Sequence, residues 1–224
     1  ATPPATSTPT PTILWFPLTP TRTPIPTILP TATPELMPGI GEILLEDDFS
    51  QADSWLTGNM GKGTIALGPN ELSLVLTQPR GYLFSFRDEP TFDNFYLEIS
   101  ANPSLCTGLD EYGLLIRYNS PLDFYRFSLS CNGQTRLDKL VGGVASSPQP
   151  WMGSASVPRA ASSRSKLGVW ALGGSLRFFI NDEFQFSVED RILPRGMIGL
   201  FVRSGGETAV TVSFSDLVVR QLQP

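Results

Sequence analysis

Proline restricts how this chain can fold more than any other residue, and it is concentrated at one end. Residues 1–38 hold 11 of the 21 prolines, with 11 threonines and two charged side chains, Arg22 and Glu35. Proline fixes φ and has no N–H to donate, so such a segment cannot form a helix or a central strand by itself. We therefore expect residues 1–40 to be an extended, polyproline-like tail and residues 41–224 to be the folded domain.

The tail carries apolar side chains that an ordinary Thr/Pro stalk lacks. They form a dense block and a weaker one: Ile13, Leu14, Trp15, Phe16 and Leu18, then Ile25, Ile28 and Leu29. Exposed apolar patches usually mark interaction sites. We predict that these residues dock on another copy of the chain or on another protein. Folding back onto the chain's own domain and contact with a membrane surface are the alternatives.

Several tail threonines border a proline, a setting typical of O-glycosylation in extended chains. The candidates are Thr8, Thr10, Thr19, Thr23 and Thr33. The alternative is that they stay unmodified.

The composition excludes some partners. The net charge is -5 and no basic stripe occurs, which argues against nucleic acid as a partner. No run of 18 apolar residues occurs, so the sequence predicts no membrane span. The chain begins at Ala1, and we expect an extracellular or cell-surface protein whose export signal has been removed.

The two cysteines, Cys106 and Cys131, are expected to form a disulfide in an exported protein. The alternative is a pair of buried free thiols. The sequence has no histidine and no CxxC pair to complete a zinc site.

From about residue 41 the chain reads as short β-like runs separated by turn residues. The predicted strands are 42–49, 63–67, 71–77, 81–86, 92–101, 111–119, 123–130, 134–141, 165–172, 175–181, 183–188, 196–203 and 208–219. No long amphipathic helix is evident. The fold class is therefore all-β, a two-sheet antiparallel sandwich or jelly roll.

Details of this pattern make sharper predictions. Alternation within 111–119 places Tyr112, Leu114, Ile116 and Tyr118 on one face. The pair Asn132-Gly133 is typical of a type I′ hairpin turn. The polar stretch 142–165 is expected to be a binding loop or a plain surface excursion.

Five segments carry a resemblance to a known superfamily. They are LLEDDFSQADSW, YGLLIRYNSPLDFYRFSLSCNGQTRL, LRFFINDEFQFSVED, GMIGLFV and VSFSDLVV. Together they resemble the concanavalin A-like lectins and glucanases, in particular the laminin-G-like jelly rolls of exported bacterial proteins, over about residues 42–220. The resemblance implies two curved sheets with paired terminal strands. Members include sugar binders, glycosidases and adhesive modules, so it informs the fold more than the function.

The sequence lacks the residue patterns that catalysis by this superfamily would need. Glucanases of this superfamily carry Glu-x-Asp-x-x-Glu on one strand, and this spacing is absent. The adjacent acidic residues Glu46, Asp47 and Asp48 cannot all point to one face of a strand. Without histidine, the Ser–His and Cys–His nucleophile systems are absent too. We expect a protein that is not an enzyme.

Two kinds of ligand remain as candidates. Jelly rolls of this type sometimes bind calcium near their paired termini, where Asp47, Asp48 and Asp216 could supply oxygen ligands; no other cofactor is expected. Glycan binding needs exposed aromatic side chains, and Trp55, Trp151 and Tyr82 are available, of which Trp151 and Tyr82 are the candidate contacts. The resemblance also implies that Trp55 and Trp151 lie in the core or at its rim.

The favoured function is a structural subunit of an extracellular bacterial filament or surface assembly. In it the N-terminal tail would dock on a neighbouring subunit, which resembles fibres built by donor-strand exchange. The alternative is a non-catalytic carbohydrate-binding module on a Thr/Pro-rich stalk.

Overall fold

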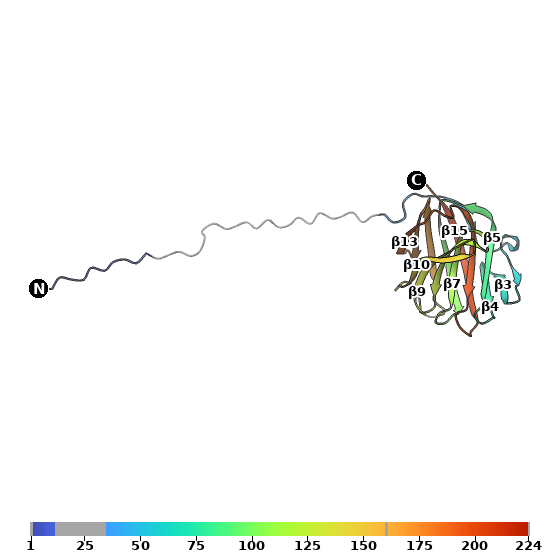
Figure 1. Ribbon diagram of the computed structural model, residues 1–224, viewed down its shortest axis with the longest axis horizontal. Coiled ribbons are helices and arrows are strands. Elements are labelled where there is room, and N and C mark those ends of the chain that lie inside the picture. Colours follow the sequence, from blue (N-terminus) through green and yellow to red (C-terminus); the bar gives the residue numbers. More distant parts are fainter. Residues whose placement is uncertain (1, 12–34, 160, 224) are drawn as a thin grey trace. The chain divides into compact units, whose positions relative to one another are not determined.

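The computed structural model describes residues 2–11, 35–159 and 161–223 (Figure 1). The chain divides into two units, Ala1–Pro34 and Glu35–Pro224. Residues 2–11 contain no helix or strand and are exposed, and this segment includes two of the glycosylation candidates, Thr8 and Thr10.

The other tail predictions lie outside the described residues. They concern the docking residues Ile13, Leu14, Trp15, Phe16, Leu18, Ile25, Ile28 and Leu29 and the threonines Thr19, Thr23 and Thr33.

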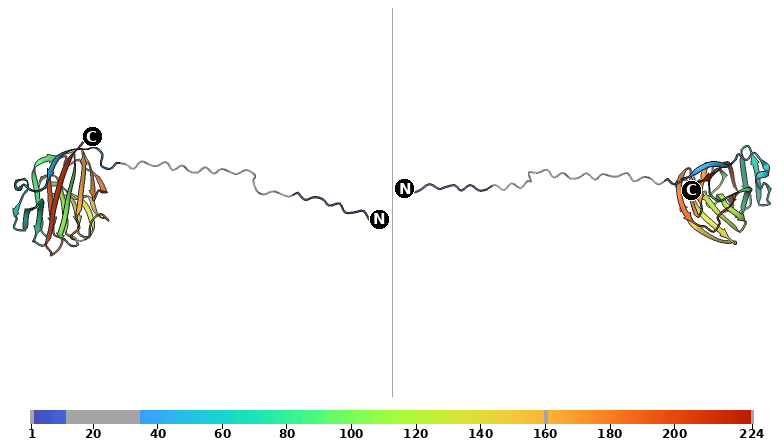
Figure 2. Two further views of the ribbon diagram at one scale, coloured as in Figure 1. Left: turned by 180° about the vertical axis from the view of Figure 1, so that it is seen from behind. Right: turned by 90° about the horizontal axis from the view of Figure 1, so that it is seen from above.

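The second unit is an all-β sandwich of two antiparallel sheets, as predicted, and Figure 2 shows them as facing layers. The larger sheet runs β13 (Glu183–Glu189), β12 (Ser175–Ile180), β11 (Ser165–Leu172), β6 (Phe95–Leu105), β15 (Val210–Leu222), β4 (Glu71–Leu76), β3 (Gly63–Gly68), β2 (Gly58–Asn59). Beside this path, β1 (Ile40–Asp47) pairs with β15, so the two terminal strands are paired. A single 3-10 turn, η1 (Ala52–Ser54), follows β1.

The smaller sheet has six strands. Its order is β10 (Val144–Gly153), β9 (Gln134–Val141), β8 (Asp123–Ser130), β7 (Glu111–Ser120), β14 (Gly196–Arg203) and β5 (Tyr82–Phe92).

The core lies between the sheets and is built by strand alternation. Val210, Val212 and Phe214 of β15 point into it, as the sequence predicts. Across the layer, the rings of Phe127 on β8 and Phe178 on β12 have centroids 4.8 Å apart. Every second residue of a strand therefore lies on an outer face of the sandwich, where its side chain can contact a ligand or another segment.

The predicted disulfide between Cys106 and Cys131 is confirmed, with Cα atoms 5.9 Å apart. Cys106 follows β6 of the larger sheet, and Cys131 follows β8 of the smaller sheet. The disulfide therefore links the two sheets covalently at one end of the sandwich.

The prediction that Tyr118 shares a face with Tyr112, Leu114 and Ile116 is wrong. Arg117 has φ 50°, and the pairing of β7 with β8 shifts register after Ile116. This bulge turns Tyr118 onto the outer face, while Arg117 turns inward and is 1% exposed.

Arg117 holds three loops together from inside. Its guanidinium donates to the carbonyl oxygens of Asp93 at 2.8 Å, Gly173 at 2.8 Å and Leu193 at 3.1 Å. Since these carbonyls belong to three separate connections, the arginine fixes one end of the sandwich. Burial lowers the pKa of Arg117 from its ordinary value.

Two details of the connections also differ from expectation. The stretch 142–165 contains an edge strand, β10, which lies exposed and carries two prolines, residues tolerated on sheet edges. At Asn132-Gly133 only the glycine has positive φ, so the turn is not type I′. Asn181 and Asp182 do both have positive φ, at 53° and 65°.

Residues 36–38 belong to the sandwich rather than to the tail. Arg177 donates to the carbonyl of Leu36 at 2.8 Å, and Trp170 Nε1 donates to that of Pro38 at 2.9 Å. Arg177 also stacks over Trp170, 4.3 Å from the ring centroid. These contacts anchor the chain on the outer face of the larger sheet just before β1.

A polar cluster lies at the edge of the core. Asp190 accepts hydrogen bonds from Tyr125 at 2.8 Å and from Ile192 N at 3.0 Å, and it pairs with Lys139 at 2.5 Å. Burial opposes the charged carboxylate, but the hydrogen bonds, with Lys139 first among them, hold the pKa of Asp190 below its ordinary value.

Candidate functional site

The outer face of the smaller sheet is hollowed by a pocket of about 350 Å³, which we call the groove. Its lining comes from β5, β7, β8, β9 and β14 and consists of Tyr82, Phe84, Leu115, Tyr118, Pro121, Phe124, Arg126, Leu140 and Arg203. Strand alternation gathers these side chains, because each lies on the face opposite to the core. The volume is within the range of small-ligand sites, roughly 300–1,000 Å³.

One position on this face requires glycine. Gly113 on β7 lies opposite Phe201 on β14 and Ser128 on β8. A Cβ atom at Gly113 would lie 2.1 Å from the carbonyl oxygen of Phe127, and the residue has φ 152°. Only glycine fits at this position.

Aromatic rings form one wall of the groove. Phe86 and Tyr118 stack with centroids 5.3 Å apart, and Tyr118 stacks on Phe124 at 5.8 Å. Tyr82 lies 5.6 Å from Phe84. These rings give the groove an apolar wall, as is common in small-ligand pockets.

Two arginines of the lining, Arg126 and Arg203, take part in ion pairs. Arg126 pairs with Asp138 at 2.5 Å, and Arg203 pairs with Glu111 at 2.7 Å. Arg136 lies between the two carboxylates, 3.1 Å from Glu111 and 2.9 Å from Asp138. The five side chains form one network across four neighbouring strands, which holds the arginines in place.

Some polar atoms on this face have no partner among the described residues. The hydroxyls of Tyr82 and Ser128 are buried and make no hydrogen bond there. Burial raises the pKa of the Tyr82 hydroxyl, which therefore stays a protonated donor. Buried polar groups usually have a partner, so these hydroxyls indicate room for a water molecule or a ligand.

The structure brings the two predicted glycan contacts to the same face. Tyr82 lines the groove itself. Trp151 lies farther out on the edge strand β10, where Arg136 stacks on its ring at 4.4 Å. Trp55 is 5% exposed and packs in the core against Phe49, as expected.

Sequence reasoning did not find the other groove residues, although one signal was present. Tyr82, Phe84 and Phe86 alternate along one predicted strand, which places three aromatic side chains on a single face. Tyr118 was missed because its bulge depends on contacts of Arg117 with distant loops.

The two carboxylates beside the groove are occupied by ion pairs. Glu111 is bonded to Arg136 and Arg203, and Asp138 to Arg126 and Arg136. A glycosidase needs one carboxyl group as acid and another as base or nucleophile, both facing the glycosidic bond. In this structure both carboxylates accept hydrogen bonds from arginines and hold those arginines in place.

The aspartates considered for calcium have other partners. Asp47 accepts hydrogen bonds from Trp55 Nε1 and Arg87 Nη1, both at 2.9 Å. Asp48 accepts one from Ser50 N at 3.0 Å, and Asp216 pairs with Arg164. Within residues 2–11, 35–159 and 161–223, no group of three His, Cys, Asp or Glu side chains could hold a metal ion. The calcium hypothesis thus gains no support from this arrangement.

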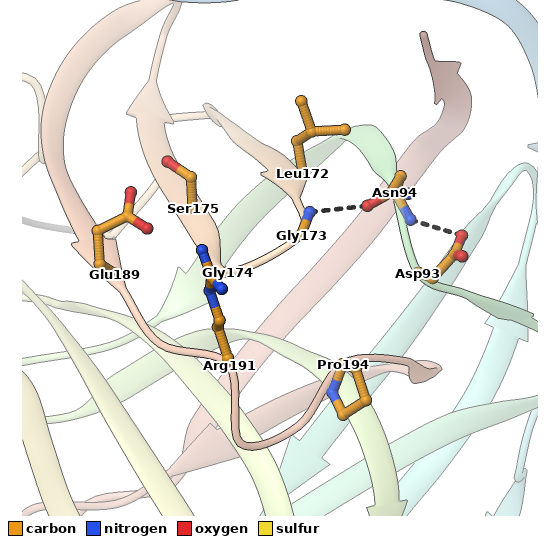
Figure 3. A pocket seen from close by; sticks show the side chains of 9 residues that line it. All are labelled: Asp93, Asn94, Leu172, Gly173, Gly174, Ser175, Glu189, Arg191 and Pro194. Atoms are coloured by element: carbon orange, nitrogen blue, oxygen red, sulfur yellow. Dashed lines mark hydrogen bonds between the residues drawn. The ribbon is translucent and has the colours of Figure 1, made fainter. Parts of the chain in front are cut away.

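A larger pocket of about 590 Å³ lies at one end of the sandwich (Figure 3). Its lining consists of Asp93, Asn94, Leu172, Gly173, Gly174, Ser175, Glu189, Arg191 and Pro194. Its charged side chains are exposed, it has no aromatic wall, and Asn94 is used to accept a hydrogen bond from Gly173 N at 2.8 Å. We therefore favour the smaller groove as the functional site.

The sequence matches no family model and no curated protein. The fold, however, is similar to that of several solved structures. Carbohydrate-binding module CBM66 from Bacillus subtilis has a TM-score of 0.61 at 18% identity, covering 75% of this chain and 96% of that one. A Bacillus subtilis protein of unknown function with a galectin-like fold has a TM-score of 0.64 at 15% identity, covering 83% and 99%.

Enzymes share this fold as well. Bacillus licheniformis β-glucanase has a TM-score of 0.60 at 13% identity, covering 82% of this chain and 99% of that one. Likeness at this identity shows the two-sheet β-sandwich fold alone, because the same fold occurs both in a binding module and in enzymes. In the described part of the chain, no helix is long and apolar enough to cross a membrane.

Proposed function

We propose that the folded domain is a non-catalytic carbohydrate-binding module that holds a glycan in the groove. One observation carries this proposal: the groove combines an aromatic wall with fixed polar donors in a single pocket of about 350 Å³. Sugar rings have apolar C–H faces and polar hydroxyl edges, so their recognition needs both kinds of surface. The proposed role ranks above the filament hypothesis, since solved structures of the same fold include a carbohydrate-binding module.

The non-catalytic part of the proposal rests on the ion pairs. Removing Glu111 or Asp138 from its arginines would leave buried charges without partners, which is costly. Their role is to position Arg126, Arg136 and Arg203 along the groove.

A pair of phenylalanine variants tests the proposal. Phe84 is half-buried in the groove, whereas Phe184 on β13 of the larger sheet is 40% exposed. We expect the full chain to bind one class of glycan on an array, and Phe84→Ala to weaken that binding about tenfold through lost stacking, roughly 1–2 kcal/mol. Phe184→Ala is the matched control and should bind normally. Absence of binding to every glycan, or equal loss in both variants, would contradict the proposal.

We also propose an extracytoplasmic location, for which the disulfide between Cys106 and Cys131 is the support. The tail would then serve as a stalk, with its threonines as glycosylation sites. Mass spectrometry of the native protein tests this: glycosylation predicts added hexose masses on peptides that contain Thr8 or Thr10.

Assembly through the tail stays a prediction, and one feature of the domain favours it. Strand β1 pairs with β15 alone, and its Ile40, Ile43 and Leu44 are 39%, 47% and 47% exposed. An apolar edge strand of this kind can accept a strand from another chain. Deleting residues 1–34, which leaves the contacts of Leu36 and Pro38 with the sandwich intact, should then convert fibres, seen by electron microscopy, into monomers; fibres that persist would rule the tail out.

A further inference from the structure

We propose that the groove selects glycans that carry a carboxylate, such as uronic acids. This inference rests on the proposed function and names the class of sugar. It follows from the N–H groups of Arg203 and Arg126 that donate to no described residue, and from the charge of the face on which the two arginines lie.

Arg203 presents a free edge for a carboxylate. Within the described part of the chain, the only hydrogen bond of its side chain runs from Nη1 to Glu111, at 2.7 Å. The Nε–Nη2 edge is therefore unoccupied, and this edge matches the two oxygens of a carboxylate. The side chain is 43% exposed and lines the groove, so a ligand can reach it.

Arg126 adds a second donor on the same pocket. It uses Nε and Nη2 for Asp138, at 3.2 and 2.5 Å, and has Nη1 left over. Its guanidinium lies 5.6 Å from the centroid of Phe201, so the cation rests on an aromatic ring beside the aromatic wall. A sugar stacked on that wall would have its substituents between the two arginines.

The charge of the face supports an anionic ligand. Three arginines, Arg126, Arg136 and Arg203, face two carboxylates, Glu111 and Asp138, which gives 3 − 2 = +1 on the network. The whole chain has a net charge of -5. An excess positive charge fixed at this groove, on an otherwise acidic protein, favours a negative group there.

The experiment compares matched acidic and neutral sugars on the full chain. Oligogalacturonate, alginate and glucuronoxylan oligosaccharides are titrated by calorimetry, each beside its methyl ester, in which the carboxylate is masked. We expect at least one acidic form to bind about tenfold or more tightly than its ester, since a charged hydrogen bond contributes roughly 1.5–3 kcal/mol.

Two variants then locate the effect. Arg203→Gln should weaken binding of the acidic form about tenfold or more and leave the ester unchanged. Arg220→Gln, on β15 of the other sheet, removes the same charge and should change nothing.

The outcomes separate this inference from the proposed function. Equal binding of acid and ester, or an acid preference that survives Arg203→Gln, overturns the inference and leaves glycan binding intact. Binding of neutral glycans alone also overturns the inference and leaves glycan binding intact. Absence of binding to any acidic or neutral glycan, including those of the array, overturns both.

Discussion

Replacing Arg117 by methionine tests how the end of the sandwich is held. The variant keeps most of the apolar stem but removes three hydrogen bonds, at 2.8, 2.8 and 3.1 Å, from carbonyl oxygens of three connections. Leaving each carbonyl without a donor costs about 1 kcal/mol or more, so the free energy of unfolding should fall by about 3 kcal/mol.

Urea unfolding followed by tryptophan fluorescence measures this loss. With an m value of about 2.5 kcal/mol/M, the midpoint should fall by about 1.2 M. Arg195→Met is the control, because Arg195 is exposed and, among the described residues, its side chain donates only to the hydroxyl of Thr91. A shift for Arg117→Met below about 0.3 M, or equal to that of the control, would refute the account of Arg117 as the tie between loops.

Three further predictions concern stability. Replacing both Cys106 and Cys131 by alanine should lower the free energy of unfolding by about 3.5 kcal/mol in the chain-entropy model, measured by denaturant unfolding. The pKa of Asp190 is held below 3.8, so its contribution is present above that pH and is lost as the pH falls through the folded pKa; the stability cost of Asp190→Asn should therefore be largest at pH 7 and should shrink as the pH falls below 3.8. Gly113→Ala should cost about 2 kcal/mol or more by calorimetry, whereas Gly206→Ala, which has open space, should be neutral. An unchanged unfolding midpoint after the cysteine replacement would contradict the first prediction. A stability cost of Asp190→Asn that does not change with pH would contradict the second, and equal stability of the two glycine variants would contradict the third.

Local pattern was enough to predict much of the fold. Alternation placed Val210, Val212 and Phe214 in the core, and the two cysteines were expected to pair. The core positions are predictable because burial on a strand alternates from one residue to the next. The disulfide is predictable because two cysteines in an exported protein usually pair.

The remaining features depend on contacts between distant segments. The bulge at Arg117 follows from carbonyls that come together only in the folded chain, so alternation assigned Tyr118 to the wrong face. Strand β10 was read as a loop because an edge strand can be polar on both faces and can contain proline.

The groove combines both cases. Tyr82 and Trp151 could be proposed from their residue type, and both lie on the outer face of the smaller sheet. The arginine network could not be predicted, since Arg126 and Arg203 come from β8 and β14 and meet their carboxylates only across neighbouring strands.

The most direct test of the central claim is to map where a bound glycan lies. A titration of the isotope-labelled protein with the best array ligand, followed by amide chemical shifts, reports every strand at once. The account predicts shifts centred on Phe84, Leu115, Arg126 and Arg203 in the groove. Shifts centred instead on the pocket around Gly173 at the end of the sandwich would contradict it.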